Sequence, residues 1–341
     1  MLDVRSVARA ALALLALTLS SCATHTPTSV APGCDISAQD REWINGALDA
    51  WRFTANEITG VRTMRPFEAV FFDDDCVLTS PNAFSATSVA EVTWTAALHT
   101  GEIMLPGGQP MPAGVTSFAS ADGDDAFFVM STPSVWRAAG VTNDALGLET
   151  MMTGVLLHEG SHVAQFDAYG ARIGAIETAS HLPGDGINDD MVQNRFGENA
   201  EFAASVERET ALLFQITNTR DQAEARRLAR EARELMRARQ ARWYTGADAY
   251  LVDAEDTWLT LEGSGQWVAY QWIVHPSGGG ADSDVAMANF AQRGRWWSQK
   301  EGIALAFAVD RLAGFDWKRH AFGDGQMTLV QMLDAALASE G

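Results

Sequence analysis

The chain has 341 residues, of which 44 are Asp or Glu and 24 are Lys or Arg, so its formal net charge is −20. Hydrophobic residues make up 47% of the sequence. That share is enough to fill the core of one large or two ordinary domains, and it excludes a disordered chain. Because surplus negative charge repels phosphate backbones, the composition also argues against a nucleic-acid-binding protein.

The N-terminus has the pattern of an export signal. Arg5 and Arg9 precede an apolar run that is about half as long as a helix needs to span a bilayer. We therefore expect residues 1–21 to be a signal peptide.

The end of this signal resembles the lipobox of bacterial lipoproteins. It reads Leu-Ser-Ser-Cys, and the cysteine is Cys22. The resemblance implies a lipid on Cys22 and a tether over residues 22–33, and the absence of Asp at Ala23 favours an outer-membrane location facing the periplasm. The alternative is an ordinary signal peptide with an incidental cysteine.

Two further cysteines, Cys34 and Cys76, remain in the exported chain. An even number in an oxidising compartment predicts a disulfide. Closing a loop of this length stabilises a fold by about 4 kcal/mol in the chain-entropy model. The alternative is a pair of buried free thiols.

The first part of the folded chain is predicted to contain one helix and a small sheet. Ser37 and Asp40 resemble a capping box with Asp in place of Glu, and apolar residues follow at helical spacing. Short apolar runs then predict strands at 69–72, 76–79, 91–98, 102–105 and 126–130. Pro and Gly residues predict a loop over 106–114.

The rest of the chain reads as helical, with predicted helices at 150–167, 199–216, 222–245, 251–273, 295–313 and 327–338. A sheet followed by helices indicates an α+β fold. We expect one domain over 34–341, with a sheet-rich part at 34–132 and a helical part at 133–341.

Eight arginines lie in residues 220–242, interleaved with acidic residues. The spacing predicts an exposed helix with ion pairs three and four residues apart; a surface for acidic partners or a membrane is the alternative. The remainder of the chain holds 16 basic and 40 acidic residues. Such an acidic body suits a metal cation or a basic substrate better than an anionic one.

The most informative motif is His158-Glu159-Gly160-Ser161-His162, the H-E-x-x-H pattern within an apolar stretch. Histidines four residues apart on a helix point to one side and can share a Zn²⁺ ion, while Glu159 can act as general base on an activated water. Gly160 costs about 1 kcal/mol in a helix interior relative to Ala, which suggests that another element packs closely there.

Together with this motif, the stretch Trp258-Leu-Thr-Leu-Glu262-Gly resembles the helix that supplies the third metal ligand in gluzincin-type zinc metallopeptidases. The resemblance spans roughly residues 127–319. It implies a zincin-like metallopeptidase domain in a bacterial lipoprotein, with one Zn²⁺ ion held by His158, His162 and Glu262. Gly265 and Trp267 stand where that family usually has Ala and Tyr.

Alternatives remain at several positions. Glu198 or Glu201 could be the third ligand or a supporting carboxylate instead of Glu262. Tyr270 and His275 are candidate donors to a developing oxyanion. We also expect the strand at 126–130 to be a sheet edge that pairs with an extended peptide.

Tryptophans cluster between Trp258 and Trp297. Such a cluster could pack the helical core or form an aromatic subsite.

These observations predict a zinc-dependent hydrolase, most readily a peptidase, that acts on a peptide or protein substrate and is lipid-anchored to the bacterial envelope. The alternative is an envelope lipoprotein that binds a metal or a partner without turnover.

Overall fold

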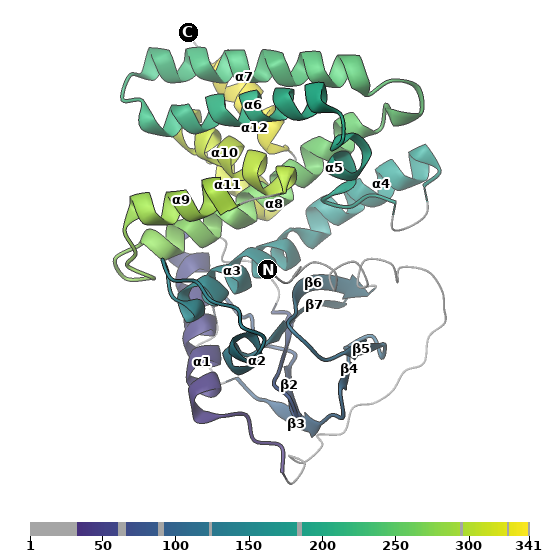
Figure 1. The fold of residues 1–341 in the computed structure, drawn as a ribbon, viewed down its shortest axis with the longest axis vertical. Helices are drawn as coiled ribbons and strands as arrows, with labels where there is room; N and C mark the ends of the chain where they lie inside the picture. The colour runs from purple at the N-terminus through teal and green to yellow at the C-terminus, as the bar shows by residue number, and fades with distance from the viewer. Residues whose placement is uncertain are drawn as a thin grey trace.

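The computed structural model describes residues 33–60, 66–87, 92–122, 125–182, 186–293, 296–325 and 327–339. The predicted signal peptide, Cys22 and all of the tether except Gly33 lie outside these ranges, as does the start of the strand predicted at 91–98. Within them the chain is an α+β protein whose strands all precede a large helical part (Figure 1).

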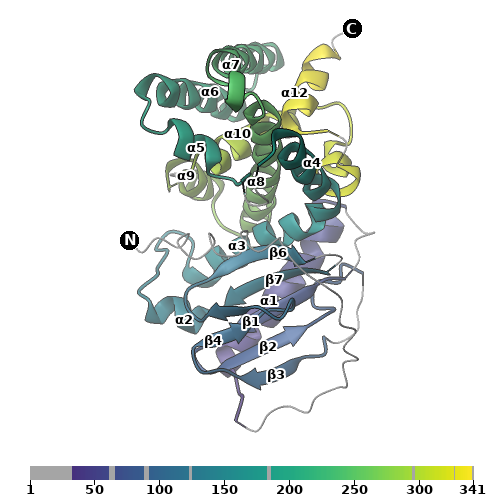
Figure 2. The same ribbon diagram turned by 90° about the vertical axis from the view of Figure 1, so that its right-hand side faces the viewer.

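The main sheet has five strands in the order β3-β2-β1-β7-β6. β1 runs parallel to β7, and the other neighbours are antiparallel. Figure 2 shows β6 at the edge nearest the helical part. The strands are β1 (Glu68–Phe72), β2 (Cys76–Ser80), β3 (Thr95–Leu98), β6 (Ser117–Asp122) and β7 (Asp125–Ser131).

Two strands were not expected. β5 (Pro110–Pro112) pairs with β4 (Glu102–Met104) in a hairpin where the sequence predicted only a loop. β6 has the sequence Ser-Phe-Ala-Ser-Ala-Asp, which lacks the β-branched residues that mark most strands. Both strands are therefore stabilised by their pairing partners more than by local preference.

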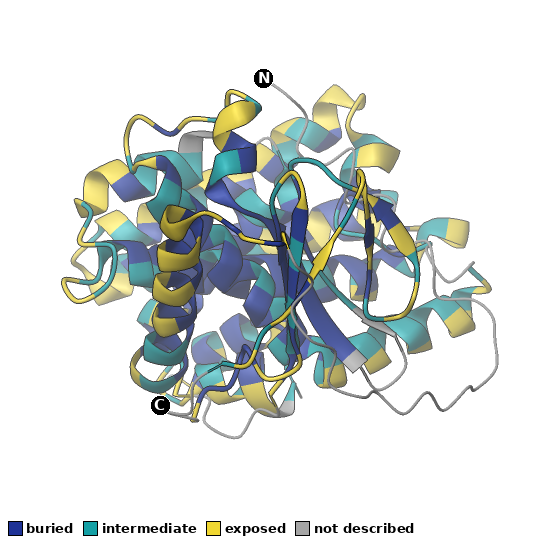
Figure 3. Cartoon of the chain, turned by 90° about the horizontal axis from the view of Figure 1, so that it is seen from below, coloured by how far each residue is buried: buried dark blue, intermediate teal, exposed yellow. Residues whose placement is uncertain are grey.

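Both faces of the sheet are covered (Figure 3). On one face, Trp43 and Trp51 of α1 (Ala38–Phe53) pack edge-on against Phe71 and Phe67. The other face packs against the β4–β5 hairpin, where Ile103 is fully buried. This two-sided burial explains why β1 and β7 are almost continuously apolar.

The N-terminal segment contains the helix cap and the disulfide that the sequence predicted. The Ser37 side chain accepts a hydrogen bond from the Asp40 amide, so α1 begins at the expected cap. Cys34 and Cys76 form a disulfide with their Cα atoms 5.2 Å apart. The disulfide ties the segment before α1 to the first residue of β2.

The helical part contains all six helices predicted after residue 144. Short helices α2, α4, α5, α9 and α11 were not predicted. The helices are α2 (Pro133–Ala138), α3 (Leu148–Gln165), α4 (Ala171–Ser180), α5 (Met191–Phe196), α6 (Ala200–Asn218), α7 (Gln222–Trp243), α8 (Leu251–Val274), α9 (Ser283–Arg293), α10 (Trp297–Leu312), α11 (Trp317–Arg319) and α12 (Leu329–Ala338). None of the helices in the described ranges is both long and apolar enough to cross a membrane.

Glycines allow the central helices to approach closely. A β-carbon at Gly160 would lie 2.9 Å from the Trp51 ring, which confirms that another element packs against α3 at this position. α8 and α10 meet backbone to backbone, because a β-carbon on Gly263 would overlap the carbonyl oxygen of Gly302. These contacts fix α8 against α10 and α3 against α1.

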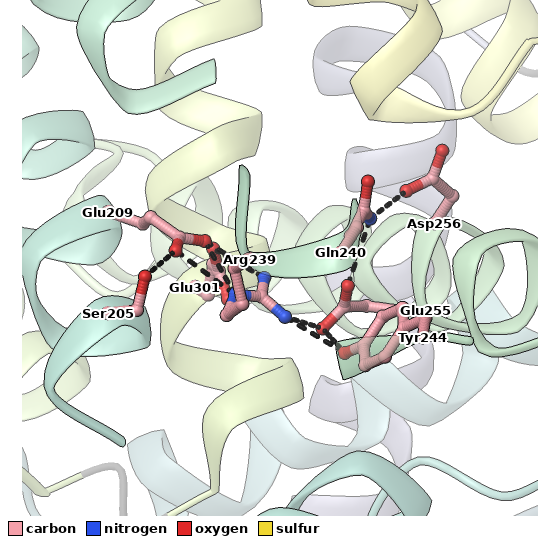
Figure 4. A network of polar contacts seen from close by, with 8 residues as sticks. All are labelled: Ser205, Glu209, Arg239, Gln240, Tyr244, Glu255, Asp256 and Glu301. Carbon is pink, nitrogen blue, oxygen red and sulfur yellow. Dashed lines mark hydrogen bonds and ion pairs between the residues drawn. The ribbon is translucent and has the colours of Figure 1, made fainter. Parts of the chain in front are cut away.

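The arginine-rich helix α7 has the predicted surface ion pairs, but one of its arginines is not exposed. Arg227 pairs with Glu224 and Glu231 at the expected spacings, with N···O distances of 2.7 and 2.9 Å. Arg239, however, is fully buried rather than exposed. Its side chain carries the ion pairs with other helices shown in Figure 4.

Candidate metal centre

Three of the predicted residues converge in space. Nε2 of His158 and Nε2 of His162 lie 2.9 Å apart. Each also faces the Glu262 carboxylate, at 3.5 Å from His158 and 3.3 Å from His162. Among the described residues this triad is the one group of His, Cys, Asp and Glu side chains with ligand atoms all within 4.8 Å of one another.

Two helices hold the triad. His158 and His162 lie one turn apart on α3, so their rings point the same way. Glu262 is 4% exposed and projects from α8, which crosses α3 with Gly154 against Ile273. Gly265, one turn beyond Glu262, leaves room for the His158 ring, since a β-carbon there would approach Nδ1 to 2.8 Å.

Glu159 lies beside the triad and is half-buried. Burial raises its pKa to about 7, with smaller upward contributions from Glu262 and Asp189, while His162 and the Ala119 backbone amide lower it. Cation binding at the triad would lower this pKa again. The carboxyl group is thus placed in an environment where it can both accept and release a proton.

His162 is also perturbed. Burial lowers its pKa, but the hydrogen bond to Glu262 and the charges of Glu262, Glu159 and Asp189 outweigh burial, so the pKa is raised overall. The surroundings therefore favour positive charge at this point, which is the environment that a metal cation requires.

Asp189 was not identified from the sequence. Its charge acts on both Glu159 and His162, which places its carboxylate near the site. It lies in the loop before α5, where no periodic pattern distinguishes it from other acidic loop residues.

The alternative third ligands lie elsewhere. Glu201 is exposed at the start of α6 and forms an ion pair with Arg242 of α7. Glu198 is exposed in the turn before that helix. The structure therefore brings Glu262, and neither Glu198 nor Glu201, to the two histidines.

The two candidate oxyanion donors also lie away from the triad. Tyr270 is buried against Phe307 and Phe290, and its place eight residues after Glu262 corresponds to a rise of about 12 Å along the helix. The His275 ring packs on Phe53, and its Nδ1 accepts a hydrogen bond from the Ser277 amide. Neither side chain is positioned to contact a group held at the triad.

The expectation of an edge strand at 126–130 is wrong, because β7 is paired on both sides, with β1 and with β6. The edge next to α3 is β6 instead. Its residue Ala119 donates a backbone hydrogen bond to Glu159. The free side of this edge therefore faces the candidate centre.

Comparisons of the chain with models of protein families, with curated proteins and with solved structures find no match.

Proposed function

We propose that this protein is a zinc-dependent hydrolase that cleaves peptide bonds. The observation that carries the proposal is the convergence of His158, His162 and Glu262 on one point, with Glu159 beside them. The donor set fits the ion, since two imidazole nitrogens and one carboxylate are ligands that catalytic Zn²⁺ sites use.

The number of ligands supports catalysis over the alternative of a purely structural metal site. Structural zinc sites are closed by four protein ligands, whereas catalytic sites have three and keep a position open. The described residues supply three. When bound, zinc supplies Lewis-acid chemistry by polarising a carbonyl and lowering the pKa of water.

Each of the residues at the centre would then have its own role. The Glu159 carboxylate would take a proton from water as the water oxygen adds to the peptide carbonyl, and would pass that proton to the amine nitrogen as the C–N bond breaks. His158, His162 and Glu262 would hold the ion, and Gly265 sets how deeply the His158 ring sits.

A peptide is the substrate that the surroundings favour. The edge strand β6 offers backbone groups beside Glu159, and an extended peptide can pair with such an edge. The acidic composition of the chain is consistent with a substrate that is not strongly anionic.

The variant Glu159→Gln tests the mechanism. It should abolish cleavage of a peptide library while zinc content, measured by atomic spectroscopy, stays near one ion per chain. Glu149→Gln is the matched control on the same helix, where Glu149 pairs with Arg137 at the surface. Full activity in Glu159→Gln would refute the role given to this residue, and absence of metal from the native protein would refute the metal site.

We also propose that the chain is exported and anchored by lipid at Cys22, facing the periplasm. The Cys34–Cys76 disulfide supports an oxidising compartment. Growth with a labelled fatty acid should label the wild type and not Cys22→Ser. Equal labelling of the two proteins would contradict the anchor.

A further inference from the structure

A buried glutamine joins the two helices that carry the candidate metal ligands. Gln165 lies on α3, three residues after His162, and is 1% exposed. Its Nε2 donates hydrogen bonds to Ser264 Oγ on α8 and to the carbonyl oxygen of Ala321, both at 2.7 Å. Because a carbonyl oxygen can only accept, the contact with Ala321 fixes which way the amide points. Ser264 lies two residues after Glu262, so the hydrogen bond connects α3 and α8 close to their ligands.

The hydroxyl of Ser264 is itself held by α8. Its Oγ donates a hydrogen bond to the carbonyl oxygen of Thr260 at 2.6 Å, and Ser264 is fully buried. Since the hydroxyl hydrogen is used within α8, the oxygen is left to accept the hydrogen bond from Gln165. The contact between the helices therefore has a defined direction and a fixed partner.

The glutamine extends the row of ligands on α3. His158, His162 and Gln165 lie at positions i, i+4 and i+7, so they project from one face of the helix. The two histidines contact Gly265 and Glu262 of α8, and the glutamine contacts α8 one turn further on. The amide is thus the next polar contact along the interface that brings the ligands together.

The regular part of α3 ends at this glutamine. Gln165 has a ψ of −8°, whereas an α-helix has about −42°, and the π-helix Phe166–Gly170 follows. The Phe166 amide bonds to the carbonyl of Val163, three residues back instead of four. Because the hydrogen-bond ladder changes within one turn of His162, the backbone alone does not hold that turn rigidly. Short π segments of this kind often occur at functional sites.

The amide adds little to stability, because one of its atoms lacks a partner. Among the residues that the structure describes, nothing hydrogen-bonds to Gln165 Oε1, although the atom is buried. An unsatisfied buried acceptor costs about as much free energy as a typical buried hydrogen bond contributes. A methionine would fill the same space without that cost. Folding alone therefore does not account for a glutamine at this position.

We propose that Gln165 is a positioning residue for the metal centre. It holds the last turn of α3 against α8, so that the His162 ring stays within reach of the ion that His158 and Glu262 also face. The glutamine does not contact the ion itself. The inference rests on the proposed function for its consequence, although the contact between the helices can be measured in metal-free protein.

Metal binding is the first test. Gln165→Met keeps the length of the side chain and removes the amide. Zinc affinity, measured by competition with a chelator, should fall about tenfold or more, as it does when support of a metal ligand is lost. The visible absorption spectrum of the Co²⁺-loaded protein should also change, because it reports the geometry of the ligands. The urea midpoint of the metal-free variant should stay close to that of the wild type.

A second variant and a control sharpen this test. Ser264→Ala removes only the acceptor, so it should reproduce the loss of affinity if Gln165→Met fails to fold. The double variant should lose no more than either single variant, because both break the same contact. Tyr169→Phe is the control: the Tyr169 hydroxyl lies one turn beyond the glutamine and hydrogen-bonds to the carbonyls of His320 and Met327. It should lower the urea midpoint and leave zinc affinity and the Co²⁺ spectrum unchanged.

The contact between the helices is the second test. Spin labels would be attached at two exposed positions, just beyond α3 and on α8, as Asp167→Cys and Asp253→Cys in the Cys22→Ser chain. The distance distribution between the labels, recorded on metal-free protein by double electron–electron resonance, should be broader in Gln165→Met than with Gln165 present.

The two tests separate this proposal from the proposed function. If the wild type binds zinc, unchanged zinc affinity in folded Gln165→Met and Ser264→Ala would overturn the assignment. If the wild type binds none, the proposed function fails, and the label distances decide the role of the glutamine. A broader distribution then supports the contact, and an identical distribution would refute it.

Discussion

Gly265 of α8 lies directly against the imidazole of His158, where a β-carbon would come within 2.8 Å of Nδ1. The position of the His158 ring on one helix is thus set by the absence of a side chain on another. Any side chain at position 265 would compete with this ring for the same space.

Gly265→Ala should therefore displace His158. We expect zinc affinity, measured by competition with a chelator, to fall about tenfold or more, as it does when support of a metal ligand is lost. Gly46→Ala in α1 is the control, because a β-carbon there meets nothing within 4 Å. That change should leave zinc affinity intact and stabilise the helix by about 0.5–1 kcal/mol. Unchanged affinity in Gly265→Ala would contradict the packing argument.

Arg239→Met should destabilise the fold. The guanidinium is the partner of Glu209 and Glu255, and removing it leaves buried carboxylates unpaired. Breaking such a pair costs about 3–5 kcal/mol, measurable by urea denaturation. Arg227→Met breaks exposed ion pairs on the same helix and should lower the free energy of unfolding much less, because solvent screens such pairs. Similar losses in the two variants would show that the buried network is not important for stability.

Asp256 should make stability depend on pH. Burial raises its pKa to about 7, helped by Glu255 and opposed by Arg233 and Gln240. Between about pH 4 and 7 the folded state therefore holds a proton that the unfolded state has lost, so this group's contribution is complete at the acidic end and declines as pH rises towards 7.

Asp256→Asn should remove this decline in the free energy of unfolding. The difference from the wild type should be on the order of a few kcal/mol across the window. The measurement is the free energy of unfolding in urea at pH 4.5 and at pH 8, about the two ends of this window. Asp253→Asn, one turn away and exposed, is the control. An identical pH profile in Asp256→Asn and the wild type would show that Asp256 titrates normally.

Removing the disulfide should lower the free energy of unfolding without changing the candidate metal centre. Cys34→Ser with Cys76→Ser should reduce the free energy of unfolding by about 4 kcal/mol, since the unfolded chain gains the freedom of the opened loop. Zinc content should not change, because the bridge joins the segment before α1 to β2. A reducing agent should destabilise the wild type and leave the double variant unaffected.

The grouping of His158, His162 and Glu262 could be predicted because its signal is local. His158 and His162 share one helical turn, and Glu262 lies in a stretch whose pattern is distinctive. The buried ion-pair network could not be predicted in the same way: Glu209, Arg239 and Glu255 come from three separate helices, and only tertiary packing brings them together. β6 was missed for a related reason, since pairing with β7 outweighs its weak strand preference.

The crossing of Gly263 and Gly302 has a consequence for how this centre could change during evolution. Glu262 is next to a point where two backbones touch, so its location depends on main-chain contact and only weakly on which side chains fill the surrounding core. Neighbouring apolar residues can therefore be exchanged for others of similar volume while the carboxylate stays in place. A single added methyl group at either glycine would move it.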